Sequence, residues 1–266
     1  MPYAAAEGAE IWFEVEGTPG APWLTFSNGL CLEMGQWDRQ VEAFGSHFRI
    51  LRYDTRGHGR SGKPVGDCSF DVLANDVVSI WDHLGIESSS FCGLSLGGMT
   101  GMTLALNHPK RIERLVVCDC RGDCPPALQE QWLSRQQQVM VNGVASLVDE
   151  NVKRWLNESF RQSHPAISKK LGDMIRRTTL EAYFGCSEAL KKLNVAERVG
   201  DITAPTMFLV GEKDGPHPAL MAEMHKRLPG STYKVIEGAA HLSNIDSEQP
   251  FNHAVMAFLD PAQSKA

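Results

Sequence analysis

Short apolar runs alternate with segments of helical periodicity along the first half of the chain. Runs of large apolar residues, which are typical of buried strands, occur at Trp23–Phe26, Phe48–Tyr53, Phe91–Cys92 and Leu115–Cys118. Between them lie two segments of helical periodicity, Phe70–Leu84 and Leu96–His108. This alternation predicts an α/β protein with a parallel sheet and helices on both of its faces.

The ends of these two helices carry recognisable signals. Ser69 is a suitable N-cap for the first helix, and Gly85 is a suitable residue to end it. Pro109 ends the second helix, because proline has no amide hydrogen and its ring clashes with the preceding turn.

The pattern changes near residue 123. From there to about residue 199 the chain shows no strand signal, and helices are predicted at Ala127–Val141, Val144–Leu156, Ile167–Thr178 and Glu181–Leu193. The alternation then resumes, with strands at Pro205–Val210 and Tyr233–Ile236 and helices at Pro218–Leu228 and Phe251–Leu259. We therefore expect residues 1–122 and 200–266 to form the sheet domain, with residues 123–199 inserted as a helical cap over one end of the sheet.

The clearest chemical motif lies between a predicted strand and the helix that follows it. Residues 93–98 read Gly-Leu-Ser-Leu-Gly-Gly and match the pattern G-x-S-x-G. Such a turn strains the backbone at the serine, and the flanking glycines let strand and helix approach closely. The hydroxyl of Ser95 is then expected at a helix N-terminus, where free amides favour developing negative charge. We predict Ser95 as a nucleophile and the amide of Leu96 as one oxyanion donor.

A serine hydroxyl is a weak nucleophile without a base, and His241 is the best candidate. It directly follows the last predicted strand and so lies at the carboxyl edge of the sheet, where open α/β sheets bind ligands. His58 also follows a strand, but it lies in a tight Arg-Gly-His-Gly-Arg turn, and we expect a structural or site-lining role. We expect surface or packing roles for the other histidines: His47, His83, His108, His164, His217, His225 and His253.

The base requires a carboxylate that fixes its tautomer and stabilises the imidazolium. Asp214 follows the predicted strand Pro205–Val210, which gives the chain order serine, aspartate, histidine. Asp119 is the alternative, because it ends the strand after the helix of the serine motif, at the same edge of the sheet. We favour Asp214.

A second oxyanion donor is expected in the loop after Trp23–Phe26, which reads Ser-Asn-Gly-Leu-Cys at residues 27–31. Gly29 permits a turn that aims the amide of Leu30 inward. Leu30 and Leu96 together form the predicted oxyanion hole.

Taken together, these residues resemble the α/β-hydrolase superfamily and, more narrowly, the 3-oxoadipate enol-lactonases of the β-ketoadipate pathway of aromatic catabolism. The resemblance covers nearly the whole chain and is carried by residues 27–30, Trp37, Gln40 and residues 51–59, 91–98, 111–114 and 241–245. It implies the α/β-hydrolase fold and hydrolysis of a small lactone or carboxylic ester through an acyl-enzyme.

The resemblance also implies three substrate-binding residues. Trp132 and Arg135 match a Trp-x-x-Arg pattern of these lactonases, so Arg135 is expected to bind a substrate carboxylate and Trp132 to wall the pocket. The alternative is an ordinary surface arginine beside a core tryptophan. Asn28 stands where many hydrolases have histidine. The chain departs from the lactonase pattern at Cys31, at residues 119–121 and at residues 215–218, which leaves the substrate open.

Several other functions use the same scaffold. A broad carboxylesterase, a carbon–carbon bond hydrolase of aromatic catabolism and a cofactor-free perhydrolase would keep the serine. Dehalogenases and epoxide hydrolases are disfavoured, because they have aspartate where this chain has Ser95. A non-catalytic small-molecule receptor is the alternative from a different class. We expect no metal and no organic cofactor, because the acyl-transfer mechanism needs neither.

The composition of the chain limits the binding partners and the cellular location that we expect. Apolar residues make up 42% of the 266 residues and charged residues 22%, as in globular proteins, and the net charge of −6 gives no general attraction to nucleic acid or anionic membranes. No apolar run approaches the ~20 residues of a membrane helix, and no signal peptide is evident.

The odd count of seven cysteines favours free thiols in a reducing compartment, so a cytoplasmic location is expected. Cys118, Cys120 and Cys124 match no zinc signature and are expected as buried thiols. The expected partner is a small-molecule substrate, and oligomeric state is left open.

Overall fold

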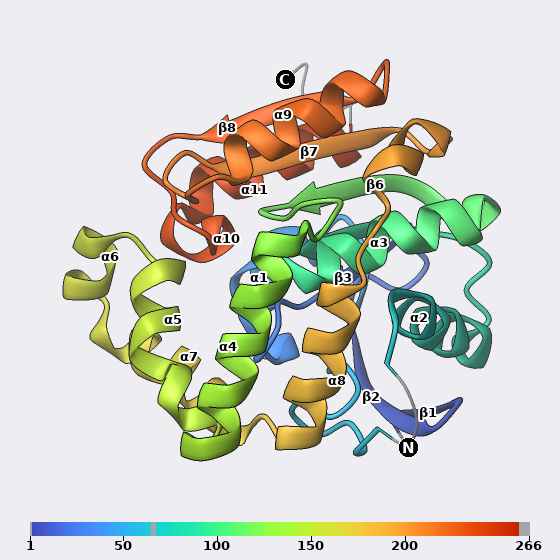
Figure 1. Ribbon diagram of the computed structural model, residues 1–266. Helices are drawn as coiled ribbons and strands as arrows, with labels where there is room; N and C mark the ends of the chain where they lie inside the picture. Colours follow the sequence, from blue (N-terminus) through green and yellow to red (C-terminus); the bar gives the residue numbers. More distant parts are fainter. Residues whose placement is uncertain (1, 65–67, 261–266) are drawn as a thin grey trace.

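A computed structural model of the chain, which describes residues 2–64 and 68–260, contains one twisted sheet between two layers of helices (Figure 1). The strands are β1 (Tyr3–Ala6), β2 (Ala9–Gly17), β3 (Trp23–Ser27), β4 (Arg49–Tyr53), β5 (Ser89–Leu94), β6 (Ile112–Cys118), β7 (Thr206–Gly211) and β8 (Thr232–Ile236). Their order in the sheet is β1-β2-β4-β3-β5-β6-β7-β8. From β4 to β8 all neighbours are parallel, whereas β1 and β2 are antiparallel additions at one edge. The predicted mostly parallel sheet is confirmed.

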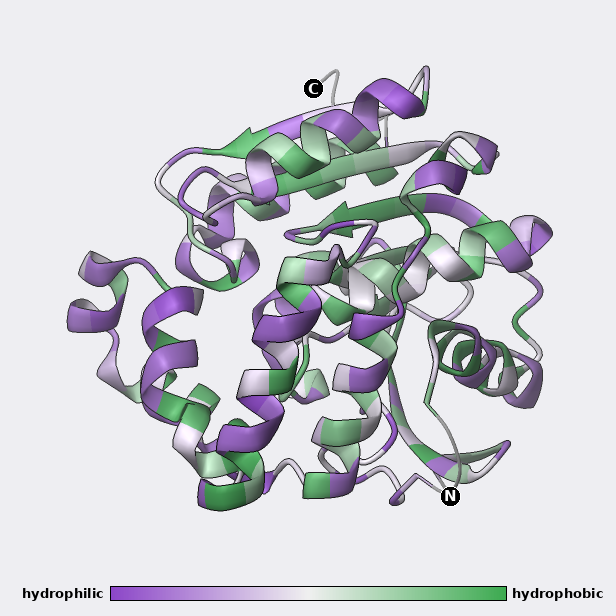
Figure 2. Ribbon diagram, in the orientation of Figure 1, coloured by the Kyte–Doolittle hydropathy of each residue, from purple (hydrophilic) through white to green (hydrophobic). Residues whose placement is uncertain are grey.

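Helices cover both faces of the sheet, and the central strands are apolar on both faces for that reason. In β6, Leu115 and Val117 pack into the cluster that contains α2 (Phe70–Leu84), α3 (Leu96–Asn107) and α9 (His217–Arg227). The alternate residues Val116 and Cys118 face the opposite cluster. That second cluster contains apolar side chains of α1 (Asp38–Phe44) and α11 (Glu248–Leu259). In Figure 2 the central strands are accordingly hydrophobic, while the helices carry most of the hydrophilic colour.

Helices α4 to α8 all lie between β6 and β7 in the sequence and gather in the lower left and lower centre of Figure 1. They are α4 (Pro126–Asn142), α5 (Val148–Trp155), α6 (Glu158–Ser163), α7 (Pro165–Arg177) and α8 (Leu180–Lys191), with a short 3-10 turn, η3 (Val144–Leu147), before α5. The remaining short elements are η1 (Met34–Trp37), η2 (Pro109–Arg111), η4 (Ala196–Asp201) and α10 (Ser243–Asp246). No helix of the described ranges has the length and apolarity that a membrane crossing demands.

The predicted helix signals act as expected at α2. The hydroxyl of Ser69 accepts a hydrogen bond from the amide of Val72 at 3.2 Å, and Gly85 ends the helix with φ of 67°. The helices predicted between β6 and β7 need correction in two details. The segment predicted as one helix, Val144–Leu156, is divided into η3 and α5, and α6 was not predicted.

All seven cysteines are free, as the sequence predicted, and all seven are buried. They include Cys118, Cys120 and Cys124, which the sequence analysis expected as buried thiols.

Candidate active site

Ser95 lies at the sharp turn between β5 and α3, in a strained backbone conformation. Its φ is 57° and its ψ is −115°, outside the regions that non-glycine residues usually adopt. The turn is tight on both sides. A Cβ on Gly93 would lie 2.1 Å from the carbonyl oxygen of Gly97, and one on Gly97 would lie 2.2 Å from that of Ser27. Only glycine therefore fits at these two positions, which explains their place in the motif.

His241 and Asp214 form a buried hydrogen-bonded pair. The Nδ1 atom of His241 lies 3.0 Å and 2.9 Å from the two carboxylate oxygens of Asp214, so Nδ1 carries the hydrogen and Nε2 remains free. Burial lowers the pKa of His241 below its usual value; the charge of Asp214 opposes this shift and that of Arg154 adds to it. The pKa of Asp214 is lowered despite its burial, because His241 and His217 both stabilise the carboxylate.

Asp119, the alternative carboxylate, serves a different set of partners. Its Oδ1 accepts a hydrogen bond from the amide of Gly211 at 2.7 Å, and its Oδ2 accepts one from the hydroxyl of Ser243 at 2.5 Å. Burial raises its pKa well above the usual value. The Asp119 carboxylate thus connects the end of β7 to α10, and the structure places Asp214 rather than Asp119 against His241.

The loop after β3 is fixed on both sides of Leu30. The amide of Gly29 donates to Oε1 of Gln36 at 3.0 Å, and the amide of Cys31 donates to Nε2 of His58 at 3.1 Å. His58 is buried and donates from Nδ1 to the carbonyl of Arg56 at 3.1 Å, so its role is structural, as expected. Between these anchors, the amide of Leu30 donates no hydrogen bond to any residue in the described ranges. It is therefore free for a ligand.

Asn28 does not reach the site as a substrate contact. Its side chain is fully buried and donates from Nδ2 to the carbonyl of Tyr53 at 2.8 Å. It lies outside the lining of the cavity that contains Ser95. Asn28 thus joins the β3 loop to β4 through Nδ2, while its buried Oδ1 has no hydrogen-bond partner among the described residues.

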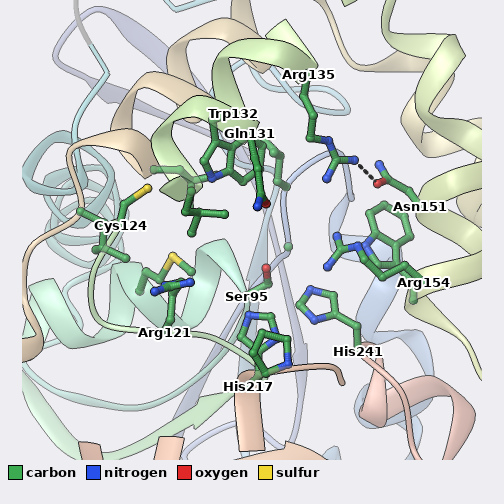
Figure 3. A pocket seen from close by; sticks show the side chains of 18 of the residues that line it. Ser95, Arg121, Cys124, Gln131, Trp132, Arg135, Asn151, Arg154, His217 and His241 are labelled. Carbon is green, nitrogen blue, oxygen red and sulfur yellow. Dashed lines mark hydrogen bonds between the residues drawn. The ribbon is translucent and has the colours of Figure 1, made fainter. Parts of the chain in front are cut away.

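A cavity of about 250 Å³ lies between the carboxyl edge of the sheet and the helices α4, α5 and α8. Leu30, Ser95 and His241 line it from the sheet side, and Trp132 and Arg135 line it from α4. Figure 3 shows the hydroxyl of Ser95 and the ring of His241 at the same end of this cavity. The structure therefore brings together the predicted nucleophile, base, oxyanion loop and cap residues.

The guanidinium groups of Arg135 and Arg154 both line the cavity, but only that of Arg135 has polar partners in the part of the chain that the structure describes. Arg135 donates from Nη2 to Oδ1 of Asn151 at 2.6 Å and lies 3.7 Å from the carboxylate of Glu150. Its guanidinium also stacks over the ring of Trp132, with 5.5 Å to the centroid. Arg154, at the end of α5, makes no hydrogen bond and no ion pair with the described residues. Figure 3 shows it directed into the cavity near His241.

Arg154, Asn151 and His217 are site residues that the sequence analysis missed. The expectation that His217 is a surface or packing residue is wrong, because His217 lines the cavity beside Ser95. Its position three residues after Asp214, at the carboxyl edge of the sheet, was the signal available for it. Arg154 and Asn151 belong to a helix with no motif, so no comparable signal marked them.

The loop that carries His241 is hydrogen-bonded to the end of α5 and to the residues that follow it. The amide of Leu242 donates to the carbonyl of Trp155, the last residue of α5, at 2.8 Å. The amide of Asn157 donates to the carboxylate of Asp246 at 2.9 Å. The end of α5 is thereby fixed to the residue next to His241.

Asp214, His217 and His241 are close enough for their ligand atoms to lie within 4.8 Å of one another. Such a set could in principle share a cation. Here the Nδ1 atoms of both imidazoles lie at hydrogen-bond distance from the same carboxylate, as expected of donors that hold it. We interpret the group as a hydrogen-bonded cluster.

The chain belongs to the α/β hydrolase fold family, whose model matches residues 22–248. A 3-oxoadipate enol-lactonase of Acinetobacter baylyi is 32% identical over 96% of this chain and 94% of its own length. The crystal structure of an enol-lactonase from Burkholderia xenovorans superposes with a TM-score of 0.92 at 34% identity, covering 97% of this chain and 99% of that one. A putative carbamate hydrolase, RutD of Serratia proteamaculans, is 28% identical over 96% of this chain and 97% of its own. The family and these relatives identify the chain as a hydrolase.

Proposed function

We propose that this protein is a serine hydrolase that cleaves a small lactone or carboxylic ester through an acyl-enzyme. The observation that carries the proposal is the strained Ser95 at the N-terminus of α3, in one cavity with a His241 whose Nδ1 is held by Asp214. This is the arrangement that nucleophilic acyl transfer requires.

The first step follows from that arrangement. The Oγ of Ser95 attacks the carbonyl carbon while Nε2 of His241 accepts the hydroxyl proton, and Asp214 stabilises the imidazolium. The amides of Leu30 and Leu96 hold the oxyanion. The bond to the leaving oxygen then breaks and that oxygen takes the proton from His241. In a lactone the leaving oxygen stays tethered to the acyl group.

The second step releases the acid. His241 removes a proton from water, which attacks the acyl-enzyme, and the Ser95 oxygen leaves with the proton that the imidazolium returns. No redox chemistry takes part in either step.

The positive charge in the cavity favours a substrate that carries a carboxylate beside its ester or lactone bond. Arg154 is uncompensated, and Arg135 keeps donors beyond the one used on Asn151. Both lie in the segment 123–199, which we propose as a cap domain that selects the substrate. The names of the enol-lactonase relatives support this substrate class.

The nucleophile is tested by Ser95→Ala. We expect a loss of at least ~10³-fold in turnover of p-nitrophenyl acetate and no labelling by a fluorophosphonate probe. Ser46→Ala, at an exposed position, is the matched control and should retain both. An unchanged rate in Ser95→Ala would contradict the proposal, and a wild type that binds ligands without turnover would favour the receptor alternative.

The substrate class is tested by Arg135→Ala on matched anionic and neutral lactones and esters. We expect kcat/KM to fall at least about tenfold for anionic substrates and little for neutral ones, because only the anionic substrates lose a charge-assisted hydrogen bond. An equal loss for both would contradict a carboxylate-binding role. Carbamates belong in the same panel, given the relatives named putative carbamate hydrolases.

A further inference from the structure

His217 lies against the carboxylate that holds the base. It is the first residue of α9, three residues after Asp214, and its side chain is 15% exposed, on the cavity wall. Its Nδ1 lies 3.1 Å from Oδ2 of Asp214 and 3.0 Å from the backbone oxygen of the same residue. Both of these oxygens are acceptors, so Nδ1 carries a hydrogen and donates it to Asp214.

The Nδ1 hydrogen of His217 is thus shared between the backbone oxygen of Asp214, to which it is hydrogen-bonded, and the carboxylate, so the carboxylate lies against two imidazoles. His241 approaches it through Nδ1 at 2.9 Å and 3.0 Å, and the two rings lie 5.6 Å apart at 43°. A catalytic carboxylate of this kind needs only the histidine that acts as base. The second donor has two consequences: it holds the carboxylate in one orientation, and it shares the negative charge that would otherwise act on His241 alone.

We propose that His217 is a positioning residue, which fixes the Asp214 carboxylate and, by sharing its charge, sets the proton affinity of His241. The proposal rests on the proposed function, since it takes Ser95 and His241 as the reacting pair. A carboxylate that already receives one hydrogen bond stabilises an adjacent imidazolium less, so His241 stays neutral, and able to act as a base, to lower pH. The electrostatic effect of His217 on His241 likewise lowers the pKa of His241.

Other charged groups lie around His241 and Asp214, and the variants of His217 leave them unchanged. Arg154 of α5 faces His241 from across the cavity and lowers its pKa. Three further titratable groups lie near Asp214, on the loop after β6 and on α10, and the charge of Asp214 raises the pKa of each: Asp119, Cys120 and Asp246.

The experiment compares wild type with His217→Leu and His217→Asn. Leucine removes the donor to Asp214, whereas the asparagine amide can place an N–H near the position of Nδ1. Two quantities are measured against pH: kcat/KM for p-nitrophenyl acetate, and the rate at which a fluorophosphonate labels Ser95. The acidic limb of both profiles reports the pKa of His241 in the free enzyme. Circular dichroism shows that each variant is folded.

In His217→Leu we expect the acidic limb to move to higher pH by about half a unit or more, because the full charge of Asp214 then acts on His241. His217→Asn should keep the wild-type limb. His253→Leu, at an exposed site on α11, is the control and should change neither profile. If the leucine variant does not fold, His217→Gln replaces it, because its amide extends toward the position of Nε2 and should show the same upward shift.

A limb that stays in place or moves to lower pH on loss of the donor would overturn the proposal, as would equal shifts in the donor-retaining and donor-lacking variants. A different result would contradict the proposed function. A wild-type protein that neither hydrolyses the ester nor labels at Ser95 would contradict both proposals, whereas normal wild-type activity with an unmoved limb contradicts only the role of His217.

Discussion

Arg154 is a residue whose charge acts against the protonation of His241. It has no hydrogen-bonding partner or ion pair among the described residues, and it lowers the pKa of a base that burial already makes less basic than free imidazole. A carboxylate bound to Arg154 would neutralise this charge and make the imidazolium easier to form. If the substrate is anionic, as proposed, we expect it to assist its own proton transfer in addition to gaining affinity.

This effect predicts a shifted pH profile for Arg154→Met. The acidic limb of kcat/KM for an uncharged ester reports the pKa of His241, which the positive charge of Arg154 lowers. Removing the charge raises that pKa, so the limb should move to higher pH by roughly half a unit. Arg154→Lys keeps the charge and should keep the limb. A limb that does not respond to the methionine variant would show that Arg154 does not act on the base.

The site residues that the sequence proposed belong to local patterns. Ser95 and its flanking glycines are recognisable from spacing alone, and the geometry at Gly97 shows why that spacing is required. Asp214 and His241 were identifiable because both follow predicted strands. Arg154 and His217 were missed, since their roles depend on the direction of a side chain into a cavity formed by segments far apart in the sequence.

Single elements show how local signals and tertiary packing combine. Helix α2 was predicted to the residue because its cap, its apolar face and its glycine end all agree. The strand β2 was missed: Ile11, Phe13 and Val15 occupy alternate positions, but Trp12 between the first two interrupts the apolar–polar alternation that marks a strand with one covered face. The four-residue strand β1 is defined only by its antiparallel pairing with β2, and the periodicity of so short a segment does not reveal that pairing.

The cap of α2 gives a prediction at this scale. Ser69→Ala removes the acceptor for the amide of Val72 and should lower the free energy of unfolding by about 1 kcal/mol, measured by urea denaturation. Ser69→Asp keeps an acceptor and should retain most of the stability. Ser79→Ala is the control on the same helix, because its hydroxyl only donates to the carbonyl of Asn75. Equal losses at the two serines would argue against the capping role.

At the scale of the whole molecule, a buried ion pair joins the loop after β4 to helix α2. Arg56 donates to the carboxylate of Asp76 through Nε at 2.7 Å and Nη2 at 2.6 Å, and the two side chains are 1% and 3% exposed. The loop that begins at Arg56 also contains His58, which holds the amide of Cys31 beside the oxyanion loop. The pair therefore connects the packing of α2 to the shape of the site.

Asp76→Asn should destabilise the whole fold, because the guanidinium of Arg56 then stays buried without a countercharge. We expect the free energy of unfolding to fall by about 3–5 kcal/mol in urea denaturation. Asp82→Asn, which breaks the exposed pair with Arg111 on the same helix, is the matched control and should cost less than about 1 kcal/mol. Similar losses for both variants would contradict the importance of burial.

The hydrogen bond from Leu242 to the carbonyl of Trp155 has a consequence for selection by size. We expect that a bulky ligand that displaces α5 also displaces Leu242, the residue next to His241, and so disturbs the alignment of the imidazole with the Ser95 oxygen. Oversized esters would then occupy the cavity in an unproductive pose. For such esters we expect kcat to change more than KM. The backbone carbonyl of Trp155 would then couple the volume of the ligand to the alignment of the Ser95 and His241 side chains.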